Sequence, residues 1–234
     1  MPLAISRLDI EDVVKNGLAP DIFRMEQAFE LLKRVGERAK DINNQRDGRY
    51  GKLFGIFQTA LKTESILAAA RVYDTRSPIY PTRCLRGVLQ YLVDNNDDLP
   101  SIREPYQLVL SLQSMSAPTV LIETIEKEPE KFAPRFAAYV SSLLDSPLRV
   151  DALDKLKTVR DKAFAHNEQA ATISGPTWES LQDLINIAKS VVGIMGWAYF
   201  STAYVVNGQY ILSDDARRPT YALDELLNVL YDQE

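Results

Sequence analysis

The sequence is poor in the residues that bind metals and form disulfides. Its 234 residues include one cysteine, Cys84, and one histidine, His166. A lone cysteine cannot form a disulfide within the chain, and such sparse use of cysteine is typical of a reducing compartment, so we expect a cytoplasmic protein. One histidine and one cysteine also exclude a zinc site of the usual His/Cys type. We therefore expect no metal and no other cofactor.

Long apolar runs and the common nucleotide or hydrolase motifs are missing as well. No apolar stretch reaches the roughly 18 residues that a membrane span needs, and the first residues lack the pattern of a signal peptide. The sequence has no glycine-rich phosphate loop and no Gly-x-Ser-x-Gly turn. Cys84 and His166 could pair as nucleophile and base on paper, but the local sequence does not support it. The net charge of −5 argues against a broad nucleic-acid surface and leaves room for a local basic cleft.

Helical periodicity dominates what is present. Hydrophobic residues make up 46% of the chain, enough for the core of one large domain. Asn16-Gly17 and Pro20 are expected to separate the first two helices. Asn207-Gly208, flanked by β-branched and aromatic residues, predicts a β-hairpin over 205–212. Apolar spacing predicts helices near 6–15, 21–45, 50–74, 82–92, 106–112, 119–126, 132–144, 147–167, 177–199 and 220–231.

These elements predict one all-α domain over residues 1–234, a helical bundle with a small C-terminal β-hairpin and a terminal helix. Its parts are a first helical hairpin and third helix (20–98), a proline-punctuated helical insertion or cap (99–146), two long helices (147–200), and the hairpin with the final helix (201–234). Four aromatic residues late in the chain are expected in the core rather than as stacking platforms for bases: Trp178, Trp197, Tyr199 and Phe200.

The stretch around the only histidine is the most informative part of the chain. Ser146 and Pro147 suit the start of a helix, and apolar residues then recur at steps of three and four. On an ideal wheel of about 100° per residue, Arg160 lies roughly 45° to one side of the apolar stripe and His166 roughly 75° to the other. The predicted buried stripe consists of Leu148, Ala152, Leu153, Leu156, Val159, Ala163 and Phe164.

Two interpretations of this arginine and histidine stay open. In the structural one, Arg160 pairs with Glu64 or Asp74 inside the bundle, and His166 bonds a backbone carbonyl. In the catalytic one, His166 transfers protons near neutral pH while the planar fork of Arg160 binds a phosphate. Asp161 could then orient one of these two groups.

The residues Arg160-Asp-Lys-Ala-Phe-Ala-His166 resemble the Arg-(four to six residues)-His motif of the HEPN superfamily. The upstream element Glu64-Ser-Ile-Leu-Ala-Ala-Ala-Arg-Val-Tyr-Asp74 resembles the abortive-infection branch of that superfamily, and the resemblance covers roughly residues 20 to 200. Within this element, Arg71 and Asp74 are expected to form structural ion pairs rather than a second active site.

The resemblance implies a homodimer formed through the motif-bearing helices and a metal-independent endoribonuclease of phage-defence or toxin–antitoxin type. Arg160, His166 and Asp161 would be its catalytic residues, in a composite site that leaves a 2′,3′-cyclic phosphate. The implied partners are RNA, bound transiently, and an antitoxin or other defence protein, with no membrane. Some relatives carry a tyrosine two residues after the histidine, where this chain has Glu168, so regulation through that tyrosine is in doubt. The alternative is a non-catalytic HEPN-fold module that binds protein or RNA.

Overall fold

Helices make up most of the chain, and the only strands among the described residues form one short hairpin. The computed structural model describes residues 7–44, 49–75, 82–165, 174–206 and 208–231. Strand β1 (Val205–Val206) pairs antiparallel with β2 (Gln209–Tyr210). The all-α prediction with a small hairpin and a terminal helix is confirmed. The helices are α1 (Arg7–Asp12), α2 (Ala19–Glu37), α3 (Ala39–Asn44), α4 (Arg49–Val72), α5 (Leu85–Asp94), α6 (Pro105–Ser114), α7 (Thr119–Lys127), α8 (Phe132–Leu144), α9 (Pro147–Thr158), α10 (Trp178–Met195) and α11 (Leu212–Tyr231).

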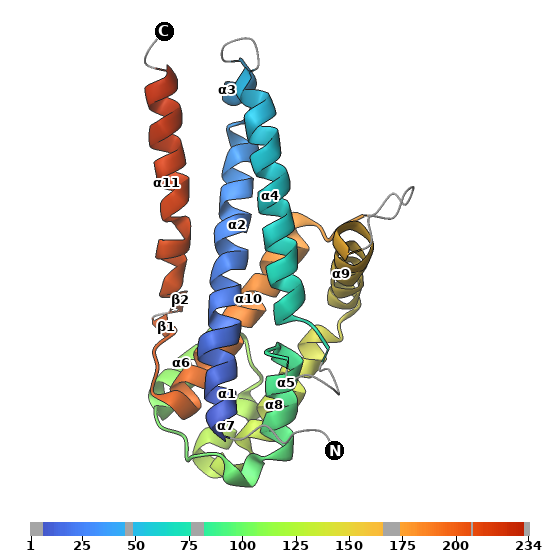
Figure 1. Ribbon diagram of the computed structural model, residues 1–234. Coiled ribbons are helices and arrows are strands. Elements are labelled where there is room, and N and C mark those ends of the chain that lie inside the picture. Colours follow the sequence, from blue (N-terminus) through green and yellow to red (C-terminus); the bar gives the residue numbers. More distant parts are fainter. Residues whose placement is uncertain (1–6, 45–48, 76–81, 166–173, 207, 232–234) are drawn as a thin grey trace.

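Helices α2 and α4 form the long spine of the molecule, with α11 along the other side of α2 (Figure 1). Apolar residues of α2 recur at helical spacing and are buried, so both of its flanks can pack against a neighbour. At the far end of the spine a small separate core forms, which we call the distal core. It consists of Val35, Ile42, Phe54 and Leu227.

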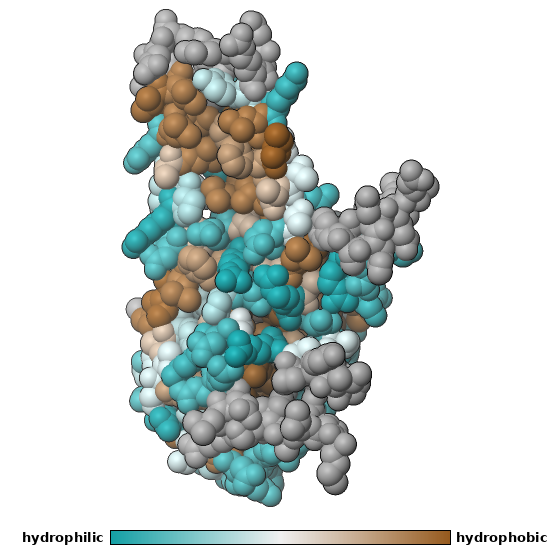
Figure 2. Space-filling model, viewed as in Figure 1, coloured by the Kyte–Doolittle hydropathy of each residue, from teal (hydrophilic) through white to brown (hydrophobic). Residues whose placement is uncertain are grey.

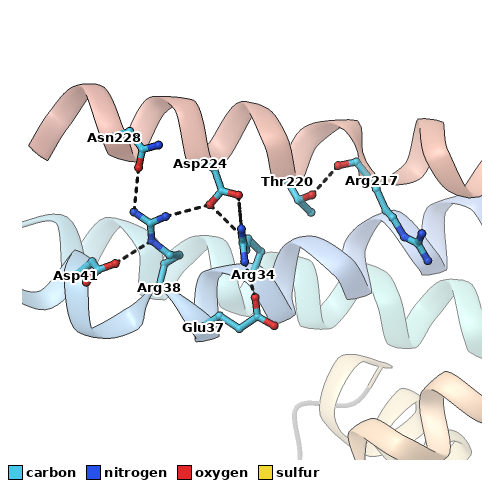
Figure 3. Close-up of polar contacts among 8 residues, drawn as sticks. All are labelled: Arg34, Glu37, Arg38, Asp41, Arg217, Thr220, Asp224 and Asn228. Carbon is cyan, nitrogen blue, oxygen red and sulfur yellow. Dashed lines mark hydrogen bonds and ion pairs between the residues drawn. The ribbon is translucent and has the colours of Figure 1, made fainter. Parts of the chain in front are cut away.

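Charged residues add polar contacts between α2 and α11 beside the distal core (Figure 3). Arg34 donates from Nε to both carboxylate oxygens of Asp224 at 2.9 Å, and Arg38 approaches the same carboxylate at 3.3 Å. Arg38 also contacts Asn228 one turn further along α11. The Asp224 side chain is 20% exposed, so this partly buried carboxylate orders two arginines at once.

The other end of the spine holds the main core, which α10 crosses and α5 to α8 surround (Figure 1). The helices of residues 99–146 contribute to this same core, with Leu108, Leu112, Phe132 and Phe136 all fully buried. A buried ion pair joins two helices here: the Lys189 ammonium lies 2.6 Å from Glu26, whose other oxygen accepts a bond from Ser213 at 3.0 Å. Glu26 is only 1% exposed, and paired partners offset the cost of burying its charge.

Two expected helix boundaries are wrong. The chain does not break at Asn16-Gly17, because α1 continues through a π-helical segment, Val13–Leu18, directly into α2. Pro20 falls in the first turn of α2, where the missing N–H costs no helical hydrogen bond. Asp21 does not cap this helix; its carboxylate instead accepts a 2.9 Å bond from Arg71. The predicted helix over 21–45 ends at Glu37, and α3 follows a bend at Arg38.

The final helix is longer than expected. It begins at Leu212 instead of Thr220 and contains Pro219. Thr220 bonds the carbonyl of Arg217, one turn earlier, at 2.7 Å, so its side chain adds a local hydrogen bond beside the proline. The hairpin before it is correspondingly short, and Gly208 adopts the positive φ of 75° that its turn requires.

Candidate active site

The motif-bearing helix α9 lies at the edge of the molecule and contacts α4, α8 and α10 (Figure 1). Ala152, Leu156 and Val159 are buried as predicted, and they pack toward α4, α8 and α10. Leu148, which we placed on the buried stripe, is instead 82% exposed. Pro147 begins the helix as expected, but the Ser146 side chain makes no capping bond.

The helix widens where the motif begins. Residues Val159–Ala165 form a π-helical segment, in which hydrogen bonds span five residues instead of four. Such widened turns occur frequently at functional sites. An ideal wheel of 3.6 residues per turn therefore does not describe Val159–Ala165, while His166 lies outside the described residues.

Arg160 is held by two carboxylates. Its Nε lies 2.7 Å from Asp161 Oδ1, and its Nη1 lies 3.0 Å from Asp74 Oδ1. These contacts raise the pKa of the guanidinium above its ordinary value, with the Asp161 hydrogen bond as the largest cause. The side chain is 28% exposed, so the group remains a cation at the surface. These two contacts use Nε and Nη1 of the guanidinium.

The partner of Arg160 belongs to the Arg71-Val-Tyr-Asp74 element at the end of α4. Arg71 pairs with Asp21 of α2 at 2.9 Å and with Glu64 at 3.5 Å. Tyr73 is buried and donates to the carbonyl of Leu184 in α10 at 2.5 Å. Burial raises the pKa of Tyr73, which keeps its hydroxyl protonated. The element thus joins α4 to α2, to α10 and to the motif-bearing segment.

These contacts settle part of the structural interpretation. The expected ion pairs of Arg71 and Asp74 are confirmed, and Arg160 pairs with Asp74 rather than with Glu64. Arg160 and Asp161 lie together. His166 and Glu168 lie outside the described residues. Cys84 is fully buried at the start of α5.

Sequence reasoning missed a pocket beside the motif. A cavity of about 400 Å³ lies between α2, α4 and the start of α10, and its lining includes Gln58, Lys62 and Trp178. Trp178 was expected in the core, but the residue is 49% exposed, because it lies in the first turn of α10 at the cavity wall. Its position directly after the capping residue Thr177 was the available signal, since first-turn residues often face solvent on one side.

Metal ligands do not gather anywhere in the ranges that the structure describes: no three His, Cys, Asp or Glu side chains come together. Across those same ranges, no helix has the length and apolarity needed to cross a bilayer.

Comparisons with known proteins point to one family. No curated protein and no solved structure matches the chain. The family model of the HEPN domain AbiU2 matches residues 8–218, which include both the Arg71–Asp74 element and the segment that carries Arg160. The all-helical fold agrees with that match. The chain therefore belongs to the AbiU2 family of HEPN domains.

Proposed function

We propose that this protein is a metal-independent endoribonuclease of phage-defence or toxin type. The observation that carries the proposal is Arg160. It lies on a widened helical turn, is oriented by Asp74 and Asp161 through Nη1 and Nε, and is 28% exposed at the start of an Arg-x5-His sequence. A guanidinium ordered at two of its nitrogens loses little further freedom when it binds a phosphate.

In the proposed reaction, the 2′-hydroxyl of the ribose loses its proton and attacks the adjacent phosphorus. The bond from phosphorus to the 5′-oxygen breaks, and that oxygen gains a proton. Arg160 stabilises the charge on the phosphorane, and His166 supplies one of the two proton transfers. Asp161 acts by orienting Arg160. The product ends are a 2′,3′-cyclic phosphate and a 5′-hydroxyl.

One histidine per chain supplies only one of the two proton transfers, so we propose that two copies form a composite site through their motif-bearing helices. The exposed apolar side chains of Leu148 and Val150 on α9 support this surface as the dimer contact. An antitoxin or another defence protein is a further proposed partner.

A second function has its own support. Both bonds of Arg160 go to carboxylates, which compete with a phosphate for the same cation. A non-catalytic HEPN-fold module that binds protein or RNA would use Arg160 only as a structural tie between α4 and the motif-bearing segment.

Cleavage of RNA by purified protein in EDTA separates the two functions. We expect the wild type to produce cyclic-phosphate ends, and Arg160→Ala and His166→Ala to lose cleavage while remaining folded and dimeric. Lys162→Ala is the matched control, because Lys162 is an exposed cation of the same segment. An inactive wild type across several RNAs would favour the binding module. Cleavage that persists in both alanine variants would mean that Arg160 and His166 are not the site.

A further inference from the structure

The cavity between α2, α4 and α10 is open beside the motif, and none of the residues proposed for cleavage lines it. Its volume of about 400 Å³ falls in the range of roughly 300–1,000 Å³ that small-ligand sites occupy. Gly175 forms part of its wall. A Cβ at Gly175 would lie 3.7 Å from Val159, the residue directly before Arg160. The wall of the cavity therefore lies next to the residue that precedes Arg160.

Trp178 has the exposure and orientation of a stacking surface. The residue is 49% exposed, and its ring meets Phe29 with centroids 5.3 Å apart and planes 62° apart. Because this contact is tilted, Phe29 supports the indole without taking a parallel stacking position on it. Trp197, the other tryptophan, is different: its indole N–H donates to the carbonyl of Val205 at 2.9 Å. Trp178 has no such bond among the described residues.

The polar groups of the cavity fit a nucleotide. Lys62 is exposed and has no ion pair within the described part of the chain, and the Gln58 amide is likewise without a hydrogen-bond partner there. The sequence from Arg49 to Thr63 contains no acidic residue, so α4 presents only positive charge along this stretch. A ring face, an amide and a free cation together match a nucleobase, its edge and its phosphate.

We propose that this cavity binds one unpaired base of a single-stranded RNA, stacked on Trp178, with a flanking phosphate on Lys62. The proposal rests on the proposed ribonuclease function and specifies its substrate: the base lies beside the phosphate that Arg160 binds. A base held in a duplex cannot enter, so the enzyme selects single strands or loops.

The test is equilibrium binding, measured by fluorescence anisotropy, of a labelled single-stranded RNA whose riboses are 2′-O-methylated to prevent cleavage. We expect Trp178→Ala to weaken binding by about 5- to 100-fold, since base stacking on an aromatic residue contributes that much. Trp178→Phe should retain most of the affinity. Tyr106→Ala is the control, because Tyr106 is a 71% exposed aromatic residue on α6, outside the cavity, and its removal should leave binding unchanged.

Two further measurements locate the base and the phosphate. A set of RNAs, each lacking the base at a different single position, locates the stacked base. At one position the missing base should weaken binding to the wild type and leave binding to Trp178→Ala unchanged. Lys62→Gln should reduce the salt dependence of binding by about 0.7 in the slope of log K against log salt, the value of one phosphate contact on a single strand. A duplex of the same sequence should bind equally to wild type and Trp178→Ala.

The outcomes separate this proposal from the proposed function. Binding and cleavage that are the same in Trp178→Ala, Lys62→Gln and the control would overturn the base site and leave the ribonuclease intact. A wild type that binds no RNA would overturn both. Thermal melting of each variant, with Trp178→Phe as the conservative replacement, distinguishes lost binding from lost folding.

Discussion

At the scale of single residues, the guanidinium of Arg160 is proposed to make three contacts at once, two with carboxylates and one with a phosphate. Arg160 contacts Asp74 and Asp161 through two different nitrogens, and the proposed reaction needs a third nitrogen for the phosphate. A planar fork can make all three contacts at once. An ammonium can carry the same charge but has no fixed geometry.

Arg160→Lys is therefore expected to lower kcat for RNA cleavage by about 10²- to 10³-fold, the usual effect of removing one stabilising donor from a transition state. The positive charge remains, so the affinity for RNA should change much less than kcat. Single-turnover cleavage and binding to uncleavable RNA measure the two quantities. Cleavage within a few-fold of wild type would show that charge alone suffices at this position.

Sequence reasoning found Arg160 because an arginine at the edge of an apolar face needs a partner or a task, and it named Asp74 as a possible partner. It could not choose between Asp74 and Glu64, since the distance from each carboxylate to Arg160 depends on tertiary packing. The Glu26–Lys189 pair was not predictable either, because 163 residues separate its members. The cavity beside Trp178 depends on three elements meeting, which no local pattern encodes.

At the scale of elements, α9 exposes the apolar side chains of Leu148 and Val150 to water, and this exposure does not stabilise a monomer. We expect Leu148→Glu to convert the proposed dimer to a monomer, because a charge on each side of a two-fold contact faces its own copy or loses its hydration. Analytical ultracentrifugation measures the change. RNA cleavage should fall with it, if the site is composite.

The matched control for this change is Val120→Glu, since Val120 is 68% exposed on α7 and lies outside α9. A Leu148→Glu protein that stays dimeric would place the contact between copies on another surface. The exposed apolar residues near the far ends of α4 and α11 are then the next candidate: Leu53, Ile56, Phe57, Leu226 and Val229 (Figure 2).

The docking of α11 on α2 depends on Asp224. Asp224→Ala should lower the free energy of unfolding by about 1–3 kcal/mol, because Arg34 and Arg38 lose their shared, partly buried acceptor. Urea unfolding gives the difference, and hydrogen exchange should show the loss concentrated in α11. Glu225→Ala, at the neighbouring exposed position, should change stability by no more than about 0.5 kcal/mol.

Helix identities were largely predictable, and helix ends were not. The periodic segments near 106–112, 119–126 and 132–144 correspond to α6, α7 and α8, because the apolar residues of each segment pack into the main core. Pro20 was taken as a boundary, although a helix tolerates proline in its first turn. The final helix was expected to begin at Thr220, whereas it begins at Leu212 and contains Pro219. The widening at Val159 leaves no mark in the apolar spacing.

At the scale of the whole molecule, burial of tyrosine makes the fold sensitive to alkali. Burial raises the pKa of five tyrosines above the ordinary value of 10.0: Tyr73, Tyr139, Tyr199, Tyr204 and Tyr210. The contribution of these buried tyrosines to folding stability is fully present below pH 10, where they are protonated in both the folded and the unfolded chain. Above it the unfolded chain releases protons that the folded chain retains, so stability falls as pH rises.

We therefore expect a cooperative loss of helical circular dichroism above about pH 10, accompanied by a step in tyrosinate absorbance. Tyr73→Phe should make stability less dependent on pH in this range, and Tyr106→Phe should not. Complete ionisation of the tyrosines in a still-helical protein would contradict the expected linkage.

The contact between α2 and α11 can form only late in the synthesis of the chain. Arg34 and Asp224 are 190 residues apart, so the ribosome has made every other described helix before their partners meet. Until Leu227 emerges, Val35, Ile42 and Phe54 remain uncovered on the finished hairpin of α2 and α4. A chain interrupted before that point displays an apolar surface to proteases and chaperones. For a protein proposed to cut RNA, this late closure gives the cell a way to discard incomplete copies.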